Sequence, residues 1–335
     1  MKNRLVVSST VGLVTLAIVL LPAICHSQEK TLRQKWKERR LARQSQAAEN
    51  AASPITQAGD YTFSLQQNGL NRRYRVHVPA GYTPDKPTAM LLSLHGGGGN
   101  MDYQADDRYY GLISKSDSAG FVAVFPNGYS RLRSGKLATW NAGICCGAAR
   151  DKGIDDVGFL RAVVRDMQTR MNIDPQRIFA SGMSNGGMMS YRLACEMADT
   201  FKAIASVAGT DGTLACTPAR AVSILHIHAR DDDRVLYNGG SGSASASHAD
   251  FVSVPVTIAK WAKLNACNSA PTRVLQVPGA YCEQYSPCRE QTQVKLCVTE
   301  TGGHSWPGGR KVRGGKQGST AISATDLMWD FFNSQ

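Results

Sequence analysis

Residues 177–197 read RIFASGMSNGGMMSYRLACEM, in which an apolar run leads through a GxSxG pentapeptide into a stretch with helical spacing. The run over 177–181 predicts a short buried strand, and residues 187–197 predict a helix. A sharp turn between a strand and a helix holds a serine hydroxyl clear of the backbone, and flanking glycines permit that crowded turn. No other GxSxG occurs in the sequence. Ser184, at the centre of the pentapeptide, is therefore the candidate nucleophile.

Strand and helix signals alternate on both sides of this stretch. Alternating apolar residues flank Asn68-Gly69 and predict a β-hairpin between Tyr61 and Val78. Further strands are expected at 90–94, 121–125, 203–207, 222–228 and 294–299, with helices near 155–171, 256–264 and 324–332 and a Gly-ended helical stretch before 121. Such alternation builds a mostly parallel sheet flanked by helices, so residues 60–335 are expected to form one α/β domain. The Gly/Ser/Ala-rich stretch 238–248 is expected to be a mobile surface loop.

A glycine run, His95-Gly96-Gly97-Gly98-Gly99, follows the expected strand 90–94. Glycines at a strand end let backbone N–H groups come close to a substrate oxyanion. A glycine run upstream of the nucleophile and after a core strand fits the oxyanion loop of an α/β-hydrolase fold. We therefore expect the backbone N–H groups of Gly97 and Asn185 to form the oxyanion hole. A flexible turn without a catalytic role is the competing interpretation.

An acid and then a histidine follow the nucleophile in the α/β-hydrolase chain order, each after a later strand. The expected strand 222–228 leads into Asp231-Asp232-Asp233, three adjacent carboxylates that position alone does not distinguish. The glycine-rich loop after the last expected strand holds His304, the candidate base. His226 and His228 lie within or at the end of a strand, where a buried structural histidine is the expected role.

The N-terminus has the pattern of an export signal. Lys2 and Arg4 precede an apolar run over 5–21, and small residues end near Ser27, so residues 1–27 are expected to be a cleaved signal peptide. The alternative is a signal anchor, because the run approaches the roughly 20 apolar residues that span a bilayer. Cleavage predicts a protein that is periplasmic or secreted.

Composition and charge exclude several classes of protein. With 42% hydrophobic and 19% charged residues, the chain is neither disordered nor a coiled coil. About half of the formal net charge of +12 lies in the first fifty residues, so no basic face that would indicate nucleic acid is required on the domain. Residues 28–59 predict a basic polar linker, in which Lys30 to Arg43 offers at most a weak contact with an anionic surface.

Removal of the expected signal peptide leaves eight cysteines: Cys145, Cys146, Cys195, Cys216, Cys267, Cys282, Cys288 and Cys297. An even number of cysteines in an exported chain indicates disulfides. No CxxC pair and no His-rich cluster with zinc spacing occurs in the sequence. We therefore expect neither a metal ion nor a cofactor.

Taken together, the motifs resemble those of the secreted esterases of the polyhydroxybutyrate depolymerase and feruloyl esterase family, over roughly 61–335 of this chain. The matching segments are Leu94-His95-Gly96-Gly97, Trp140-Asn141-Ala142-Gly143, Cys145-Cys146-Gly147, Asp155-Asp156-Val157-Gly158-Phe159, Gly182-Met183-Ser184-Asn185-Gly186-Gly187-Met188 and Gly303-His304-Ser305-Trp306-Pro307-Gly308. The resemblance implies an α/β-hydrolase fold that opens with an antiparallel hairpin, and a serine esterase activity that needs no cofactor.

The resemblance also implies which acid completes the site. In that family the acid lies four residues after the strand-end histidine of a His-Gly-Thr-x-Asp pattern, which on His228 selects Asp232. Arg230 and Asp231 depart from the pattern, so Asp231 and Asp233 remain alternatives.

Two disulfides follow from the resemblance, Cys195 with Cys216 and Cys267 with Cys288. For the other four cysteines we expect Cys282 and Cys297 to face each other across a hairpin. That pairing leaves Cys145 and Cys146 as a pair.

The expected mechanism is ester hydrolysis through an acyl-enzyme, in which Ser184 attacks, His304 moves the proton and Asp232 orients the imidazole. Trp140, Asn141 and Trp306 are expected to wall the substrate pocket. For the two tryptophans, plain core packing is the alternative.

A short-chain polyester or small ester is the first expectation for the substrate. A feruloyl or acetylxylan ester of a plant polysaccharide is the close alternative. A serine peptidase on the same scaffold and a catalytically inactive cell-envelope binding protein are the more distant alternatives.

Overall fold

The computed structural model describes residues 31, 33–34, 36–38, 53–247, 249–267, 270–310 and 317–335. The chain divides into two units, 1–50 and 51–335. The expected signal peptide and most of the expected linker lie outside the described residues. No helix in the described part is both long enough and apolar enough to cross a membrane.

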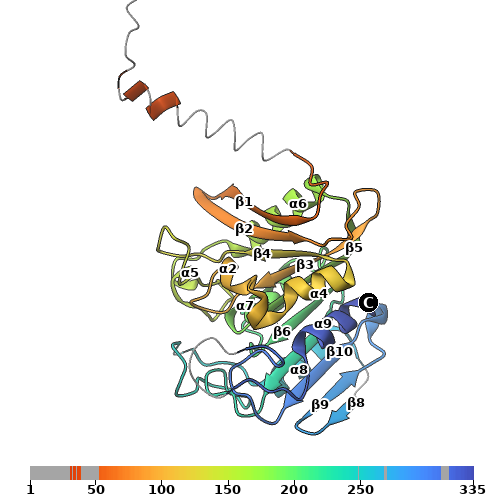
Figure 1. Ribbon diagram of the computed structural model, residues 1–335. Coiled ribbons are helices and arrows are strands. Elements are labelled where there is room, and N and C mark those ends of the chain that lie inside the picture. Colours follow the sequence, from red (N-terminus) through yellow and green to blue (C-terminus); the bar gives the residue numbers. More distant parts are fainter. Residues whose placement is uncertain are drawn as a thin grey trace, which may run out of the picture. The chain divides into compact units, whose positions relative to one another are not determined.

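Ten strands of the described chain form one sheet in the order β1-β2-β4-β3-β5-β6-β7-β10-β9-β8 (Figure 1). Their bounds are β1 Gly59–Gln67, β2 Leu70–Val78, β3 Thr88–Leu94, β4 Val122–Pro126, β5 Ile173–Met183, β6 Ala203–Val207, β7 Ser223–Ala229, β8 Thr272–Val277, β9 Ala280–Tyr285 and β10 Val294–Thr299. Strands β4, β3, β5, β6, β7 and β10 run parallel to one another. The hairpin β1-β2 borders them antiparallel on one side, and β9 and β8 on the other.

Helices cover both faces of this sheet (Figure 1). Their bounds are α2 Met101–Gln104, α3 Asp107–Tyr110, α4 Leu112–Ala119, α5 Gly147–Asp151, α6 Asp156–Arg170, α7 Asn185–Glu196, α8 Val254–Leu264 and α9 Ala324–Asn333, with a 3-10 helix, η1, at Arg289–Gln291. The core of one face joins α6, α7 and α8 to the sheet, and the core of the other face joins α4 and α9. A strand such as β3 is buried on both sides, which explains why most of its residues are apolar without alternation.

The architecture confirms the expected α/β-hydrolase fold, with its opening antiparallel hairpin and its mostly parallel sheet. Every expected strand and helix occurs, with ends displaced by a few residues at most, except that β5 begins at Ile173 rather than at 177. Strand β8 and the short helix α5 were not expected, and β9 was implied only by the hairpin expected to bring Cys282 opposite Cys297. Side chains on β8 are largely exposed, so its sequence carries little of the alternation that marks a half-buried strand.

The stretch expected to be a mobile loop makes backbone hydrogen bonds to neighbouring segments. The N–H of Gly240 donates to the Phe251 carbonyl at 2.7 Å, and that of Gly242 to the Arg234 carbonyl at 3.0 Å. The N–H of Ala244 donates to the Asp233 carbonyl at 3.1 Å. These bonds tie the stretch to the loop that follows β7.

The described residues contain four disulfides, Cys145–Cys146, Cys195–Cys216, Cys267–Cys288 and Cys282–Cys297. This pairing confirms the expected one. Cys282 and Cys297 are directly opposed in the antiparallel pair β9-β10, as expected for a bridge across a hairpin.

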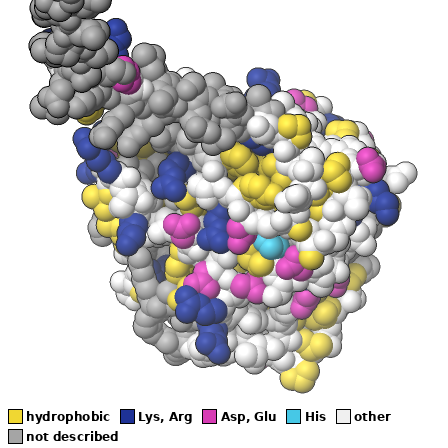
Figure 2. Space-filling model, turned by 45° about the horizontal axis from the view of Figure 1, so that its top comes forward, with side chains coloured by type: hydrophobic (Ala, Val, Ile, Leu, Met, Phe, Trp, Pro, Cys, Tyr) yellow, Lys and Arg dark blue, Asp and Glu magenta, His cyan; other side chains and the backbone are white. Residues whose placement is uncertain are grey.

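The surface drawn in Figure 2 mixes acidic and basic side chains and does not gather one sign of charge. A single-sign field of the kind that attracts a polyanion is therefore missing from that face.

Candidate active site

Ser184 occupies the sharp turn between β5 and α7. Its backbone has φ 56° and ψ −121°, and its N–H donates to the Val207 carbonyl at 2.7 Å. A non-glycine residue at positive φ is strained, and such strain concentrates at functional sites. A Cβ on Gly182 would overlap with the backbone of Gly186, and one on Gly186 would overlap with the Leu94 carbonyl. The glycines of the pentapeptide are thus required by the close approach of α7 to β5 and β3.

The glycine run after β3 lies directly beside this turn. A Cβ built on Gly96 would be 3.6 Å from the Ser184 Cβ, and one on Gly97 would be 3.6 Å from the Asn185 Cβ. The run is folded on itself, with the Gly99 N–H donating to the Gly96 carbonyl at 3.0 Å. Within the described chain, the backbone N–H groups of Gly97 and Asn185 donate to no protein acceptor. Both expected oxyanion donors are therefore available at one place.

Buried side chains hold the glycine run in position. His95 donates from Nδ1 to the Gly96 carbonyl at 2.8 Å and accepts at Nε2 from the Gly128 N–H at 2.9 Å. The imidazole is therefore neutral with its proton on Nδ1, and burial lowers its pKa from 6.5 to about 4. The Asn185 amide pairs with the Trp140 backbone at 2.7 and 3.0 Å, and the Trp140 indole N–H donates to the His95 carbonyl at 3.0 Å. Sequence reasoning missed these positioning roles of His95 and the Asn185 side chain.

Asp232 and His304 form a close pair at the ends of β7 and β10. The Nδ1 atom of His304 lies 3.1 Å from Oδ1 and 2.9 Å from Oδ2 of Asp232. The Asp232 side chain is completely buried, whereas that of His304 is 10% exposed. Burial raises the pKa of Asp232, but hydrogen bonds from His228 and His304 outweigh it and hold that pKa well below its usual range. The carboxylate therefore stays ionised beside the imidazole.

The other two acids of the aspartate run do not contact His304. Asp231 accepts the Gly303 N–H at 2.7 Å and so fixes the loop that carries the histidine. The side chain of Asp233 is exposed. Of the three adjacent acids, Asp232 is thus the one whose side chain contacts His304 in the described part of the chain.

A chain of buried polar groups continues behind Asp232. His228 Nε2 lies 2.8 Å from the Val235 carbonyl and 3.2 Å from Oδ2 of Asp232, so it must carry a proton. Nδ1 of His228 lies 3.1 Å from Nε2 of His226. Nδ1 of His226 in turn lies 2.8 Å from the Tyr191 hydroxyl. These contacts form a continuous chain of buried polar groups from Tyr191 to Asp232.

Burial keeps His226 and Tyr191, the two groups of this chain that lie farthest from Asp232, neutral. It lowers the pKa of His226 well below its ordinary value and raises that of Tyr191 well above it. Both histidines are buried, as expected, and they also orient Asp232. Their spacing of two residues, which places them on one face of β7, was the available signal.

Topology brings the three candidate catalytic residues to one edge of the sheet. Ser184 follows β5, Asp232 follows β7 and His304 follows β10, and these strands are parallel with β6 lying between β5 and β7. Carboxyl ends of parallel strands meet at the same edge, which is where α/β folds place their ligand sites.

The three residues expected to line a substrate pocket are buried in the core or hydrogen-bonded to other segments of the chain. Trp140 is fully buried, and Trp306 is buried with its indole N–H donating to the Thr325 hydroxyl at 2.9 Å. The Asn141 N–H donates to Asp156 at 2.8 Å, and its side-chain amide donates to the Ile154 carbonyl at 3.1 Å. Both indole rings are thus core residues, as the alternative interpretation has it, and Asn141 is a structural bridge.

Comparisons with known proteins place this chain in a family. Residues 118–217 match the model of the prolyl oligopeptidase family. Over 280 residues the chain is 30% identical to feruloyl esterase C of Emericella nidulans, an alignment that covers 79% of this chain and 86% of that protein. The chain belongs to the feruloyl esterase family. This membership confirms the resemblance seen in the motifs and agrees with the α/β-hydrolase architecture of the sheet.

The chain spans less than half the length of two other relatives. It is 32% identical to feruloyl esterase B of Piromyces equi over 70% of its own length, and spans 42% of that protein. It is 27% identical to the bifunctional acetylxylan esterase/xylanase XynS20E of Neocallimastix patriciarum and spans 32% of it. Among solved structures, an acetyl xylan esterase from Aspergillus awamori is similar in fold, with a TM-score of 0.54 at 13% identity over 82% of this chain and 100% of that one.

Proposed function

We propose that this protein hydrolyses carboxylic esters through an acyl-enzyme formed on Ser184. One observation carries the proposal: a buried carboxylate holds Nδ1 of His304 at 2.9 Å, at the sheet edge where the strained Ser184 turn also lies. An imidazole held in this way keeps its proton on Nδ1 and leaves Nε2 free to accept another.

The reaction follows from these groups. The Ser184 hydroxyl oxygen attacks the ester carbonyl carbon while His304 Nε2 takes the hydroxyl proton. The resulting oxyanion accepts hydrogen bonds from the N–H groups of Gly97 and Asn185, and losing one such donor costs about 3 kcal/mol of transition-state stabilisation. His304 then protonates the departing alcohol oxygen. Water repeats the attack on the acyl-enzyme, which releases the acid and restores the serine.

Asp232 contributes by orientation and charge. It accepts the Nδ1 proton of His304 and stabilises the imidazolium that forms during attack. Two backbone N–H groups, of Arg234 at 2.8 Å and Val235 at 3.0 Å, donate to its Oδ1 atom. Together with His228 they hold the carboxylate in one orientation, so little reorganisation is needed when charge develops.

For the substrate we propose a feruloyl or acetyl ester carried by a plant polysaccharide, because the names of the relatives point to these esters. A short polyester of 3-hydroxy acids is the second candidate, favoured by the motif resemblance to polyhydroxybutyrate depolymerases. The disulfides and the N-terminal sequence further support the proposal that the protein acts outside the cytoplasm, after removal of residues 1–27.

The test compares methyl ferulate, acetylated xylan and a 3-hydroxybutyrate trimer as substrates of the purified protein and of its Ser184→Ala variant. We expect turnover of the first two to exceed that of the trimer, and the variant to lose almost all activity while circular dichroism shows a retained fold. Preference for the trimer would overturn the substrate assignment. Undiminished activity in the variant would overturn the mechanism, and no turnover of any ester by the wild type would favour an inactive binding protein.

A further inference from the structure

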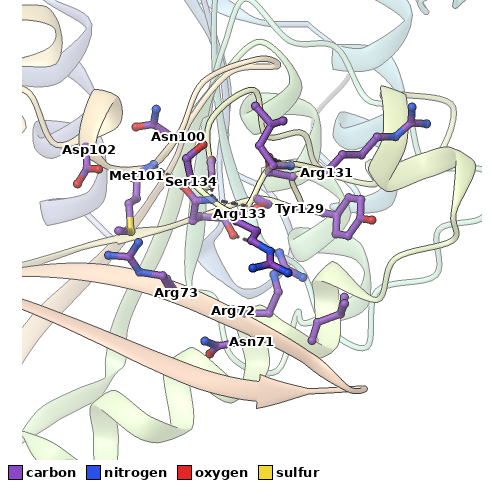
Figure 3. A pocket seen from close by; sticks show the side chains of 16 residues that line it. Asn71, Arg72, Arg73, Asn100, Met101, Asp102, Tyr129, Arg131, Arg133 and Ser134 are labelled. Carbon is purple, nitrogen blue, oxygen red and sulfur yellow. Dashed lines mark hydrogen bonds between the residues drawn. The ribbon is translucent and has the colours of Figure 1, made fainter. Parts of the chain in front are cut away.

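A pocket of about 340 Å³ opens beside the glycine run that carries the proposed oxyanion donors. Residues 70–73 at the start of β2, residues 100–102 at the start of α2 and residues 127–135 of the loop after β4 line it (Figure 3). None of these residues belongs to the Ser184, Asp232 and His304 group. The pocket therefore adjoins the glycine run and does not include the three candidate catalytic side chains.

Arginine dominates the charge of this pocket. Arg72, Arg73, Arg131 and Arg133 all line it, and Asp102 is the one acidic side chain among the described lining residues. Within the described chain, the side chains of Arg73, Arg131 and Arg133 make no ion pair and no hydrogen bond. In Figure 3, Arg133 points toward Arg72, whereas Arg131 extends away from the other arginines.

Arg72 is the buried member of the group. Its side chain is 5% exposed, donates to Asp156 at 2.7 Å and to the Asn127 carbonyl at 3.2 Å, and lies over the Phe159 ring. Its Nε atom nevertheless has no hydrogen-bond partner. A buried donor without a partner is costly, so the Arg72 side chain is not fully satisfied by its protein partners.

The pocket walls are hydrogen-bonded to the glycine run. Gly128, in the pocket wall, donates to Nε2 of His95 at 2.9 Å, and the Met101 N–H donates to the Asn127 side chain at 2.8 Å. The same loop then pairs Ala138 with Gly99. A group bound among the arginines would therefore lie beside the loop that is proposed to receive the ester carbonyl.

We propose that this pocket binds a carboxylate of the polysaccharide that carries the ester, namely a uronate unit of the sugar chain. This inference rests on the proposed function. The donors of a guanidinium lie in one plane and match the two oxygens of a carboxylate. Several arginine side chains without protein partners line this pocket, which favours binding of a monovalent or divalent anion over a neutral group. Tyr129, half-buried on the same lining, offers a ring against which a sugar can pack.

Binding is tested without turnover, on the full chain carrying Ser184→Ala. Calorimetry compares a galacturonate trimer with xylotriose, a neutral trisaccharide, and with inorganic phosphate. We expect the uronate trimer to bind at least about tenfold more tightly than either of the others, and its affinity to fall as salt screens the charges. Equal affinity for uronate trimer and xylotriose, or binding of phosphate as tight as that of the trimer, would overturn the assignment.

The arginines are tested by the double variant Arg73→Gln/Arg133→Gln in the same Ser184→Ala background. We expect it to bind the uronate trimer at least about tenfold more weakly, because the loss of even one charge-assisted hydrogen bond costs about that factor. The matched control is Arg165→Gln, an exposed arginine on α6 outside the pocket, which should bind as the parent does. An unchanged affinity in the double variant, or an equal loss in the control, would contradict the inference.

A catalytic arm separates this inference from the proposed function. Feruloyl esters of an acidic and a neutral oligosaccharide are hydrolysed by protein with Ser184 intact, and the ratio of the two kcat/KM values is compared with that of the double variant. In the double variant we expect the ratio to fall toward one, because KM for the acidic substrate rises. If esters are hydrolysed but the ratio of the two kcat/KM values is the same in the double variant, only the uronate site is refuted. If the trimer binds but no ester is hydrolysed, the proposed function is refuted.

Discussion

The substitution Asp232→Asn tests the proposed triad most informatively, because the surroundings dictate how the new amide must lie. The N–H groups of Arg234 and Val235 both donate to Oδ1, so the amide oxygen must remain there. The amide nitrogen then occupies the Oδ2 position, 2.9 Å from Nδ1 of His304. A donor at that place forces the His304 proton onto Nε2, where the imidazole cannot accept the serine proton.

The expected loss is large and specific. A wrong imidazole tautomer in an otherwise intact triad lowers kcat by about 10⁴-fold. KM should stay within about threefold, since the oxyanion donors and the substrate pocket are untouched. The amide nitrogen also faces Nε2 of His228, whose own proton makes this a contact between two donors. That contact should lower the free energy of unfolding by about 1–3 kcal/mol.

The assay is steady-state hydrolysis of p-nitrophenyl acetate, with urea unfolding of the same preparations. The matched control is Asp233→Asn, since this neighbouring acid is exposed and lies outside the proposed triad. It should retain full activity and stability. If Asp232→Asn keeps more than about a tenth of the wild-type kcat while remaining folded, the tautomer argument fails. If Asp233→Asn is the inactive variant, the acid has been assigned to the wrong residue.

Three further predictions concern the scaffold. Gly186→Ala should lower the free energy of unfolding by about 3 kcal/mol or prevent folding, because its Cβ overlaps with a carbonyl of β3, whereas Gly81→Ala, with open space around it, should be neutral in urea unfolding. The pKa of His95 is about 4 in the folded protein, whereas that of an ordinary histidine is 6.5. Between pH 4 and 6.5 the unfolded chain therefore binds more protons than the folded one, and the stability must rise with pH over this range. The corresponding loss on acidification from pH 6.5 to 4 is about 3 kcal/mol, and a flat stability profile in a pH series of urea unfolding would contradict the buried neutral imidazole. Replacing both Cys282 and Cys297 by Ala opens a loop of 15 residues and should cost about 3 kcal/mol of stability, measured against wild type under non-reducing conditions.

Sequence patterns predicted the fold well because the central strands are buried on both faces. Strands such as β3 and β6 are buried along their whole length and mostly apolar, and the turns between strands and helices carry strong glycine and aspartate signals. Strand β8 escaped prediction because its side chains lie mostly in solvent, where no periodicity is imposed. Edge strands of this kind are defined by pairing with a neighbour rather than by their own sequence.

The candidate site was predictable where the α/β-hydrolase fold fixes the order of nucleophile, acid and histidine along the chain. Ser184 and His304 follow from a motif and from a loop after the last strand. The choice of Asp232 from three adjacent acids depends on which carboxylate turns inward, and only the packing around β7 decides that. The burial of Trp140, and its bond to the His95 carbonyl, likewise depend on contacts between distant segments. Local sequence does not record such contacts.

The central claim is that one serine hydroxyl is activated by one imidazole, and covalent labelling tests it most directly. The full chain is treated with a fluorophosphonate, and the adduct is located by peptide mass spectrometry in wild type and in His304→Ala. The account predicts one adduct per chain, on the peptide that contains Ser184, and its near-complete loss in His304→Ala. An unlabelled wild-type protein, or labelling of Ser184 that does not depend on His304, would contradict it.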